Sequence, residues 1–539
     1  MGGTPGKKNG QSSIFVRLCP KSLCHNFGVQ QKATRTTIPF IPLQGELSPP
    51  LPRVCGNAEY VEREQLLDDL DELLRSSGVE AEFIAASMAA YLASSGDTAP
   101  GAKAYERHQA HSVRALRTMT LKSILQESYR GLSLQLAQSP LLRKFCQCDG
   151  LEVVKVPSKS LLQRYAQWLP HESMRAVIDR LTQAALSPAC GSGAAVGLEC
   201  PLELDMLFMD STCVAANIHF PVDWVLLRDA VRSLMKAILW VRRHGLKNRM
   251  ENPENFLSRI NGLCMAMIQA SRAFVADSKR KRKTVLRKMK KVLHAVEKHA
   301  RTYRQLLDEE WEKTGVTRGR VEAVLRRMDN VLDQLPAAKK QAHERIIGER
   351  QAPNAEKILS LYEPEIHVIV RGKASAEVEF GNSLLICEQS DGLIVDYELS
   401  QKAVAGDGNY VEESLARITS LGCGAPWGLT TDRGFDGQKN RDILEQAGLY
   451  NGLCPRKPKE LRCRMEEDEV FAACQKRRAQ TEARIAIVKR VYIGSRCLAK
   501  GFEHRQAQVD WAILAHNLNL LARLRQSERA EREKARAAA

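Results

Sequence analysis

The segment Gln475–Arg490, QKRRAQTEARIAIVKR, is the stretch around which the rest of the chain can be organised. Its Ala, Arg, Gln, Lys and Ile residues favour a helix interior, and no Gly or Pro follows before Gly494. At about 100° per residue, Arg478, Glu482 and Lys489 fall within an arc of roughly 40° on one face. The sequence therefore predicts a helix that presents one carboxylate between two cations.

The other side of this helix is apolar. Ile487, Val488 and Val491 lie towards the side opposite the charged face, where they can pack on a core. A helix this rich in charge is most often a solvated, salt-bridged surface helix. Features elsewhere in the chain are needed to favour a functional interpretation.

Two upstream carboxylates follow apolar runs that are typical of strands. Leu202–Thr212, LELDMLFMDST, suits a central strand with Asp210 at or near its C-terminal end. A short strand over Trp427–Thr431 leads into TDRGFDG and so delivers Asp432 to the end of a second strand. Ligand chemistry in open α/β sheets concentrates at the carboxyl ends of strands. Each Asp alone would more often be a cap or salt-bridge partner, so the ordered set carries the argument.

The spacing Arg-x3-Glu-x6-Lys resembles the signature helix of the DDE transposases of bacterial insertion sequences, whose motif is Tyr-x2-Arg-x3-Glu-x6-Lys. Gln475 stands where that family has its Tyr, so this chain matches three of the four motif positions. MDST followed by NIHFPVD looks like the first catalytic block of these enzymes, and Val509–Leu524 resembles their closing helix.

The resemblance implies an α/β fold, with a ribonuclease H-like mixed-sheet catalytic core, a helical N-terminal domain and a long helical insertion. That fold would bring Asp210, Asp432 and Glu482 around one cavity as catalytic, metal-binding carboxylates. Oxygen-only ligands suit two Mg²⁺ ions, with Mn²⁺ as a substitute, and not zinc. Two such ions can activate a water or a 3′-hydroxyl for in-line displacement. The implied reactions are hydrolysis that frees the 3′ end of a mobile element, then attack of that end on target DNA.

Composition and pattern divide the chain into several parts. We expect a disordered or loosely attached segment at 1–56, a helical domain at 57–187, the catalytic domain at 198–224 and 350–525, a basic helical insertion at 225–349, and a charged tail at 526–539. The 57–187 domain resembles the region that binds terminal repeats in the family. Its pattern equally allows a helix-turn-helix or a simple packing module.

The most basic stretch is Lys279–Arg304, in which Glu297 is the single acid. Val285, Met289, Val292 and Val296 give it an apolar stripe. Such a helix repels itself, so DNA phosphate contact is favoured over a solvated coiled-coil-like arm. The predicted DNA-binding residues are Arg478, Lys489, Arg433, Lys279, Arg280, Lys281, Arg282, Lys283, Arg287, Lys288, Lys290 and Lys291.

The overall composition agrees with a nucleic-acid partner. The 539 residues carry a formal charge of +17, 44% hydrophobic and 27% charged residues. No apolar run reaches the roughly 18 residues needed to span a membrane, and no secretory signal is evident at the N-terminus, so we expect a cytoplasmic protein. The family resemblance implies that it is bacterial and associated with the nucleoid when it is bound to DNA. The 15 Cys lack CxxC pairs, which favours reduced thiols over structural zinc.

Three other functions remain open from the sequence. The first is a catalytically inactive, transposase-derived DNA-binding protein, which the departure at Gln475 allows. The second is a structure-specific nuclease on the same fold, and the third is a helical scaffold. If the chain is a transposase, its partners are double-stranded DNA, as terminal inverted repeats and target, and a second copy of itself by family analogy.

Overall fold

The computed structural model describes residues 51, 54–95, 100–150, 153–186, 195–272, 277–373 and 376–538. The chain divides into two compact units, Met1–Gly45 and Glu46–Ala539. The first unit, and with it most of the loosely attached segment expected at 1–56, lies outside the described residues. Everything below concerns the second unit.

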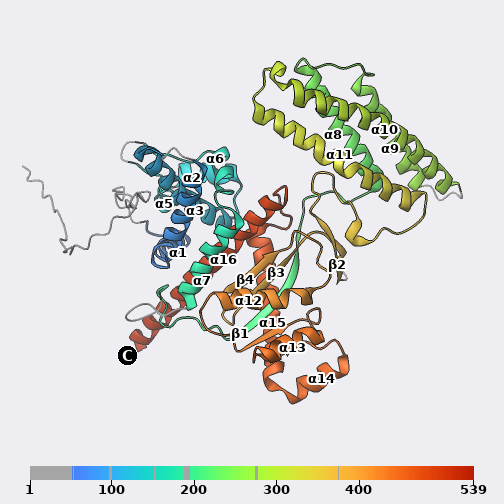
Figure 1. Ribbon diagram of the computed structural model, residues 1–539. Helices are drawn as coiled ribbons and strands as arrows, with labels where there is room; N and C mark the ends of the chain where they lie inside the picture. The colour runs from blue at the N-terminus through green and yellow to red at the C-terminus, as the bar shows by residue number, and fades with distance from the viewer. Residues whose placement is uncertain are drawn as a thin grey trace, which may run out of the picture. The chain divides into compact units, whose positions relative to one another are not determined.

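A six-stranded mixed sheet forms the centre of the second unit (Figure 1). Its strands are β1 (Met206–Ala215), β2 (His367–Lys373), β3 (Ala376–Glu388), β4 (Ile394–Leu399), β5 (Gly428–Thr431) and β6 (Tyr450–Leu453). The order is β2-β3-β1-β5-β6, and β4 pairs with the end of β3. β1 is antiparallel to β3 and parallel to β5, which is parallel to β6. The predicted mixed α/β fold is confirmed.

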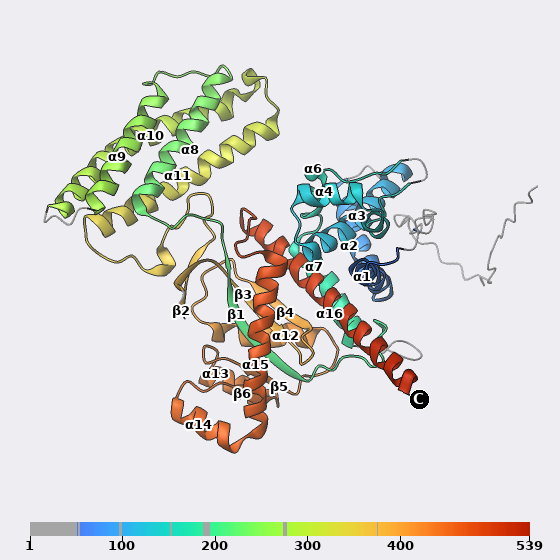
Figure 2. The same cartoon turned by 180° about the vertical axis from the view of Figure 1, so that it is seen from behind.

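Helices cover both faces of this sheet. They are α12 (Val411–Ser420), α13 (Gln438–Gln446), α15 (Glu469–Ile487) with its π-helical continuation η4 (Val488–Ile493), and α16 (Phe502–Ala538), while the short 3₁₀ helix η3 (Asp407–Tyr410) precedes α12. α14 (Pro458–Glu467) packs against α15. α15 crosses the face that is turned towards the viewer in Figure 2, and α12 lies on the other face.

The helical part N-terminal to the sheet shares its hydrophobic core. Its helices are α1 (Ala58–Ser76), α2 (Val79–Ser94), α3 (Ala102–Leu125), α4 (Tyr129–Gln138), α5 (Pro140–Phe145), α6 (Lys159–Tyr165) and α7 (His171–Leu186). Leu70 of α1, Trp511 of α16 and Ile386 of β3 belong to one continuous cluster of buried side chains. Arg175 of α7 and Arg417 of α12 both pair with the buried Asp396 of β4, which ties the helices to the sheet.

Between β1 and β2 in the sequence, the chain forms a helical insertion. It comprises α8 (Asp223–Arg243), α9 (Pro253–Arg272), α10 (Ser278–Glu310) and α11 (Arg318–Ile346), joined by the 3₁₀ turn η1 (Trp311–Thr314) and followed by η2 (Asn354–Glu356). These helices enclose a core of their own, so the insertion packs mainly on itself. The α10 residues that face this core include Leu286, Met289, Leu293 and Val296, whereas Val285 and Val292 are only partly buried. The apolar stripe of α10 is therefore centred about one residue later than the sequence predicts.

Local sequence signals set several helix boundaries. Residues 129–145 form two helices, because Ser139 caps α5 and Pro140 begins it. α3 starts at Ala102, directly after Gly101. The charged tail expected from residue 526 continues α16 to Ala538, where Arg525 and Arg529 pair with acids of α1.

Asp223 fixes the start of the insertion. It is the first residue of α8, and its buried carboxylate accepts hydrogen bonds from Gln341 and Arg345 of α11. No helix in the described ranges combines the length and apolarity needed to cross a bilayer.

A buried carboxylate holds α15 on the sheet. Glu388, at the end of β3, is fully buried and accepts hydrogen bonds from Arg477 Nη1 at 2.8 Å, Thr481 Oγ1 at 2.8 Å and Arg484 Nε at 2.7 Å. The three donors recur at positions i, i+4 and i+7, so they share one face of the helix. Arg477 also stacks over the ring of Phe208 on β1, 4.2 Å from its centroid. This arrangement fixes both the position and the rotation of α15.

We predict that Glu388→Gln lowers the free energy of unfolding by about 3 to 5 kcal/mol, because two largely buried arginines lose the full negative charge that they share. Chemical unfolding followed by circular dichroism measures the change. The control is Glu412→Gln, which breaks the exposed pair with Lys439 and should cost less than about 1 kcal/mol. Equal effects of the two substitutions would contradict the role given to Glu388.

Candidate active site

The strand register places Asp210 beside Asp432. β1 and β5 run parallel, and their last paired residues are Met209 and Thr431. Asp210 and Asp432 each follow directly, so they lie next to each other, where adjacent strands are about 4.8 Å apart. Residues aligned in this way point to the same face of a sheet. The structure thus brings together two of the three predicted carboxylates.

The position of Asp210 within its strand differs from the prediction. β1 does not end at Asp210 but continues to Ala215, paired with β3 throughout. Only the parallel pairing with β5 stops at Met209. Asp210 therefore lies where the parallel pairing of β1 with β5 ends. The apolar pattern of β1 cannot show that its pairing with β5 stops there while its pairing with β3 continues.

Helix α15 adds the third carboxylate. Phe208 and Glu388 are register partners, and Asp210, two residues beyond Phe208, points to the same face, which is the one that α15 covers. Arg478 Nη1 lies 3.1 Å from Glu482 Oε1 and 3.9 Å from Asp210 Oδ2. The guanidinium of Arg478 thus lies between the two carboxylates, and Glu482 remains 59% exposed.

Crowding of these acids changes the ionisation of Asp210. Burial, and then the negative charge of Asp432, raises the pKa of Asp210 to about 6, with a smaller contribution from Glu482. A backbone hydrogen bond from Ser211 and the charge of Arg478 act in the opposite direction. Burial and the neighbouring carboxylate of Asp432 together disfavour the ionised form of Asp210.

The carboxylates fit a divalent cation in their chemistry. All three donors are carboxylate oxygens, the ligands that Mg²⁺ and Mn²⁺ prefer. The raised pKa of Asp210 shows that additional positive charge would be favourable there. As the side chains lie, no three His, Cys, Asp or Glu residues in the described ranges are arranged as a metal shell. Arg478 occupies the space between Asp210 and Glu482 instead.

Gln475 has a structural role at the position of the motif Tyr. Its side-chain amide donates to the carbonyl oxygens of Gly452 at 3.0 Å and Thr431 at 3.4 Å. These carbonyls lie near the ends of β6 and β5, beside the loop that carries Asp432. These hydrogen bonds hold α15 against the ends of β5 and β6. Gln475, although it replaces the Tyr of the motif, therefore still supports the local geometry.

The predicted cations fall into two groups. Arg433 follows Asp432, and Arg478 and Lys489 lie on α15 and η4, so these three are close in the chain to the carboxylates. Within the described residues, Arg478 Nε is buried and has no hydrogen-bond partner. Lys489 lies one residue into the π-helix, and such irregular turns are frequent at functional sites. The apolar side of the helix is less regular than predicted, since Val488 is buried but Ile487 is 43% exposed.

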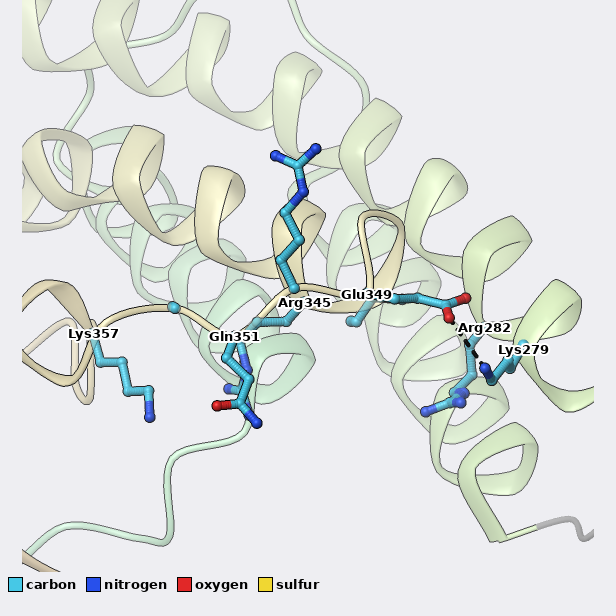
Figure 3. Close-up of a pocket in the computed structure, with 9 residues that line it drawn as sticks. Lys279, Arg282, Arg345, Glu349, Gln351 and Lys357 are labelled. Carbon is cyan, nitrogen blue, oxygen red and sulfur yellow. Dashed lines mark hydrogen bonds and ion pairs between the residues drawn. The ribbon is translucent and has the colours of Figure 1, made fainter.

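The second group lies on α10 in the insertion, which has a separate core. Lys279 and Lys283 pair with Glu349, and their hydrogen bonds lower the pKa of that carboxyl to about 2. A cavity of about 530 Å³ adjoins this cluster. Its polar lining is mainly cationic, as Figure 3 shows, and consists of Lys279, Arg282, Arg345, Glu349, Arg350, Gln351 and Lys357. Arg282 Nε is buried and, among the described residues, has no hydrogen-bond partner.

Sequence reasoning missed an acidic neighbour of the site. Ser211 Oγ donates to Asp407 Oδ1 at 2.8 Å, and a Cβ added to Gly434 would lie 2.9 Å from Asp407 Oδ2 and 3.0 Å from Asp432 Oδ1. Asp407 begins η3, in a Gly-rich loop without a strand or helix signal that could have indicated it. It anchors this loop to the residue after Asp210.

Comparison with known families now adds to the geometry. Residues 373–518 match the family model for the transposase DDE domain. This transposase domain covers a little over a quarter of the chain and includes Asp432, Arg478, Glu482 and Lys489. Asp210 lies outside the match, and the structure connects it to the transposase domain through the pairing of β1 with β3 and β5. No curated protein and no solved structure matches the chain.

A transposase DDE domain implies DNA binding, DNA cleavage and strand transfer, and use of a divalent metal ion. The match does not establish an insertion-sequence family or a bacterial source, which stay predictions.

The pKa of Asp210 gives a pH-dependent prediction. Its folded-state pKa of about 6 exceeds the ordinary 3.8, so the stability from the protonated form is present below pH 4 and is lost as the pH rises through 6. In metal-free buffer, we expect Asp210→Asn to gain on the order of 2 to 3 kcal/mol relative to the unsubstituted protein between pH 4 and pH 7.

Urea unfolding at a series of pH values measures this difference. Asp432→Asn should lower the pKa of Asp210 and so reduce the gain, because it removes the larger neighbouring charge. Glu445→Gln, an exposed change on α13, should leave it unaltered. A stability difference between the Asp210→Asn variant and the unsubstituted protein that does not vary with pH would contradict the crowded-carboxylate site.

Proposed function

We propose that the chain is a DNA transposase that cleaves the ends of its mobile element and joins the freed 3′-hydroxyls to target DNA. The observation that carries the proposal is the convergence of Asp210, Asp432 and Glu482 on one face of the sheet, beside Arg478. Two of these acids lie within the match to the transposase domain, and the strand register supplies the third.

The proposed catalytic residues are Asp210, Asp432 and Glu482, which would hold two Mg²⁺ ions, with Mn²⁺ as a substitute. When bound, such ions stabilise the attacking and leaving oxygens of an in-line phosphoryl transfer. The protein's own task is then to position the strand and to balance charge. Asp210 and Asp432 are supplied by adjacent strands of a rigid sheet, whereas the more exposed Glu482 is supplied by the helix.

Arg478 and Lys489 are proposed to hold DNA phosphates next to the carboxylates, together with Arg433. Arg478 has a donor, Nε, that is satisfied by no described residue, and a phosphate oxygen is a suitable acceptor for it. A guanidinium that now pairs with Glu482 and Asp210 can turn to the DNA once other cations neutralise these acids. Arg478 would thus balance the charge of the free site and then contribute to substrate binding.

The basic face of α10 is proposed to position DNA without reading its sequence. In the described residues, no ion pair joins Arg280, Lys281, Arg287, Lys288 or Lys291 to a carboxylate, and all five side chains are exposed. Lys279, Arg282, Lys283 and Lys290, the remaining predicted cations of α10, lie towards α11 and residue 349, where Lys279 and Lys283 pair with Glu349 and Lys290 contacts His343. We further propose that two copies of the chain dimerise when the two ends of the element are paired. The helices α1–α7 would bind the terminal repeats.

Substitution of the carboxylates tests catalysis. We expect Asp210→Ala, Asp432→Ala and Glu482→Ala each to reduce Mg²⁺-dependent cleavage of DNA that carries the element's ends on the order of 10²-fold or more. Glu445→Ala, on the exposed side of α13, is the matched control and should cleave normally. The readout is single-turnover cleavage of labelled DNA.

The same assay separates the alternatives. Equal cleavage by all variants would overturn the assignment, and absence of cleavage by the unsubstituted protein would favour an inactive DNA-binding descendant. A second substrate with a pre-formed 3′-hydroxyl end distinguishes a transposase, which joins it to target DNA, from a nuclease, which does not.

Salt dependence tests the α10 surface. Arg287→Gln combined with Lys291→Gln should flatten the slope of log K against log salt by about 2, because two phosphate contacts are lost. The control pair is Lys534→Gln with Arg536→Gln, two exposed cations at the end of α16. An unchanged slope in the α10 variant would favour the scaffold hypothesis for the insertion.

A further inference from the structure

A second cationic cavity lies between the N-terminal helices and the end of α15. Its volume is about 1020 Å³, and it is bordered by α3, the turn before α4, α6, η4, the following loop and α16. Its basic lining residues are Lys122, Arg490, Arg496, Lys500 and His504. Glu127 is the one acid in that lining, and its carboxylate accepts a hydrogen bond from Gln135.

Lys122 is the most informative of these cations. Its side chain is largely enclosed, and its Nζ lies 4.8 Å from the centroid of the Tyr129 ring. Burial lowers the pKa of Lys122, and no carboxylate of the described residues forms an ion pair with it. A cation-π contact offsets only part of the cost of removing an ammonium group from water. An enclosed ammonium beside an open cavity therefore lacks the anion that would compensate it.

The other cations of the cavity are also without partners in the protein. Among the described residues, no ion pair joins Arg490, Arg496 or Lys500 to a carboxylate. Exposed cations on a basic protein are common, and alone these would mark only a solvated surface. Their convergence with the enclosed Lys122 on one cavity, which has a single acid in its lining, indicates a site for a polyanion.

The location of the cavity indicates which anion. Arg490 is eight residues beyond Glu482 on the same continuous helix, which corresponds to about 12 Å along the helix axis at about 1.5 Å per residue. Phosphates of one DNA strand advance about 3.4 Å each along the duplex axis. A strand whose reacting phosphate lies at the carboxylates would thus place phosphates about three or four nucleotides away at the cavity.

We propose that this cavity binds the phosphodiester backbone of a DNA strand, a few nucleotides from the phosphate at the carboxylate site, through Lys122, Arg490, Arg496 and Lys500. The choice of DNA rests on the proposed function, whereas the presence of a phosphate-binding cavity does not. The N-terminal helices and η4 would then hold the same strand together, because α3 supplies Lys122 and η4 supplies Arg490.

The test compares two lysines of one helix. Lys122→Met keeps the length of the side chain and removes its charge, and Lys103→Met does the same at an exposed position of α3 outside the cavity. Binding of the full chain to a short duplex of arbitrary sequence is measured over a range of salt concentrations without divalent ions. We expect Lys122→Met to flatten the slope of log K against log salt by about 1, and Lys122→Met with Arg490→Gln by about 2, while Lys103→Met leaves it unchanged.

Two further measurements guard against a trivial loss of folding. The thermal midpoint of Lys122→Met should equal or exceed that of the unsubstituted protein, because an uncompensated enclosed charge has been removed. In the unsubstituted protein, DNA should protect Lys122, and not Lys103, from acetylation followed by mass spectrometry. Equal slopes for the two lysine variants, or equal acetylation with and without DNA, would overturn the proposal.

Competitors identify the source of the phosphate. Inorganic phosphate and a mononucleotide should each displace DNA only weakly, since neither spans four cations. Strong displacement by the mononucleotide that depends on Lys122 would assign the cavity to a nucleotide and overturn the DNA assignment. Because no step requires cleavage, an inactive protein with the expected slopes would refute only the proposed function, and an active one with unchanged slopes only the cavity.

Discussion

The buried carboxylate of Glu388 is the interaction on which the geometry of the site depends. A fully enclosed negative charge is tolerated only where donors surround it, and here Arg477, Thr481 and Arg484 all come from α15. The helix therefore cannot slide or rotate on the sheet without leaving Glu388 unpaired. Because Asp210 shares the sheet face of Glu388, fixing the helix there also fixes Glu482 and Arg478 relative to Asp210.

This arrangement lets like charges come together at a stable distance. Apolar packing alone would allow α15 to move away from Asp210 and relieve the burial that is the main cause of its raised pKa. The Glu388 contacts oppose that movement, and Arg478 balances part of the charge locally. Gln475 adds hydrogen bonds to the ends of β5 and β6, next to Asp432. A structurally sound helix thus supports an electrostatically crowded site.

Much of this could be predicted from the sequence, but not the parts that depend on strand pairing. The face of Arg478 and Glu482 follows from helical spacing alone, and the apolar run before Asp210 indicates a central strand. The register of β1 with β5 leaves no trace in either strand, so the early end of the parallel pairing was not predictable. From the sequence, Arg477 and Arg484 would be expected to be solvated charges, because their partner Glu388 lies 89 and 96 residues away from them in the chain. The Val and Ile residues of β2 indicate a strand, but its pairing with β3 was likewise not predictable from the sequence.

The net positive charge of the chain can be interpreted only when the ion pairs of its cations are considered. In the N-terminal helices and on the sheet, the arginines that lie against the core are neutralised by buried acids, as Arg175 and Arg417 are by Asp396. Cations without an ion pair among the described residues lie, among other places, on α10 and around the Lys122 cavity, on elements with different cores. Two separate cationic surfaces suit a ligand that is long and uniformly anionic better than a compact one. A small anion would need only one of these two surfaces. The presence of unpaired cations on both therefore favours an extended nucleic acid.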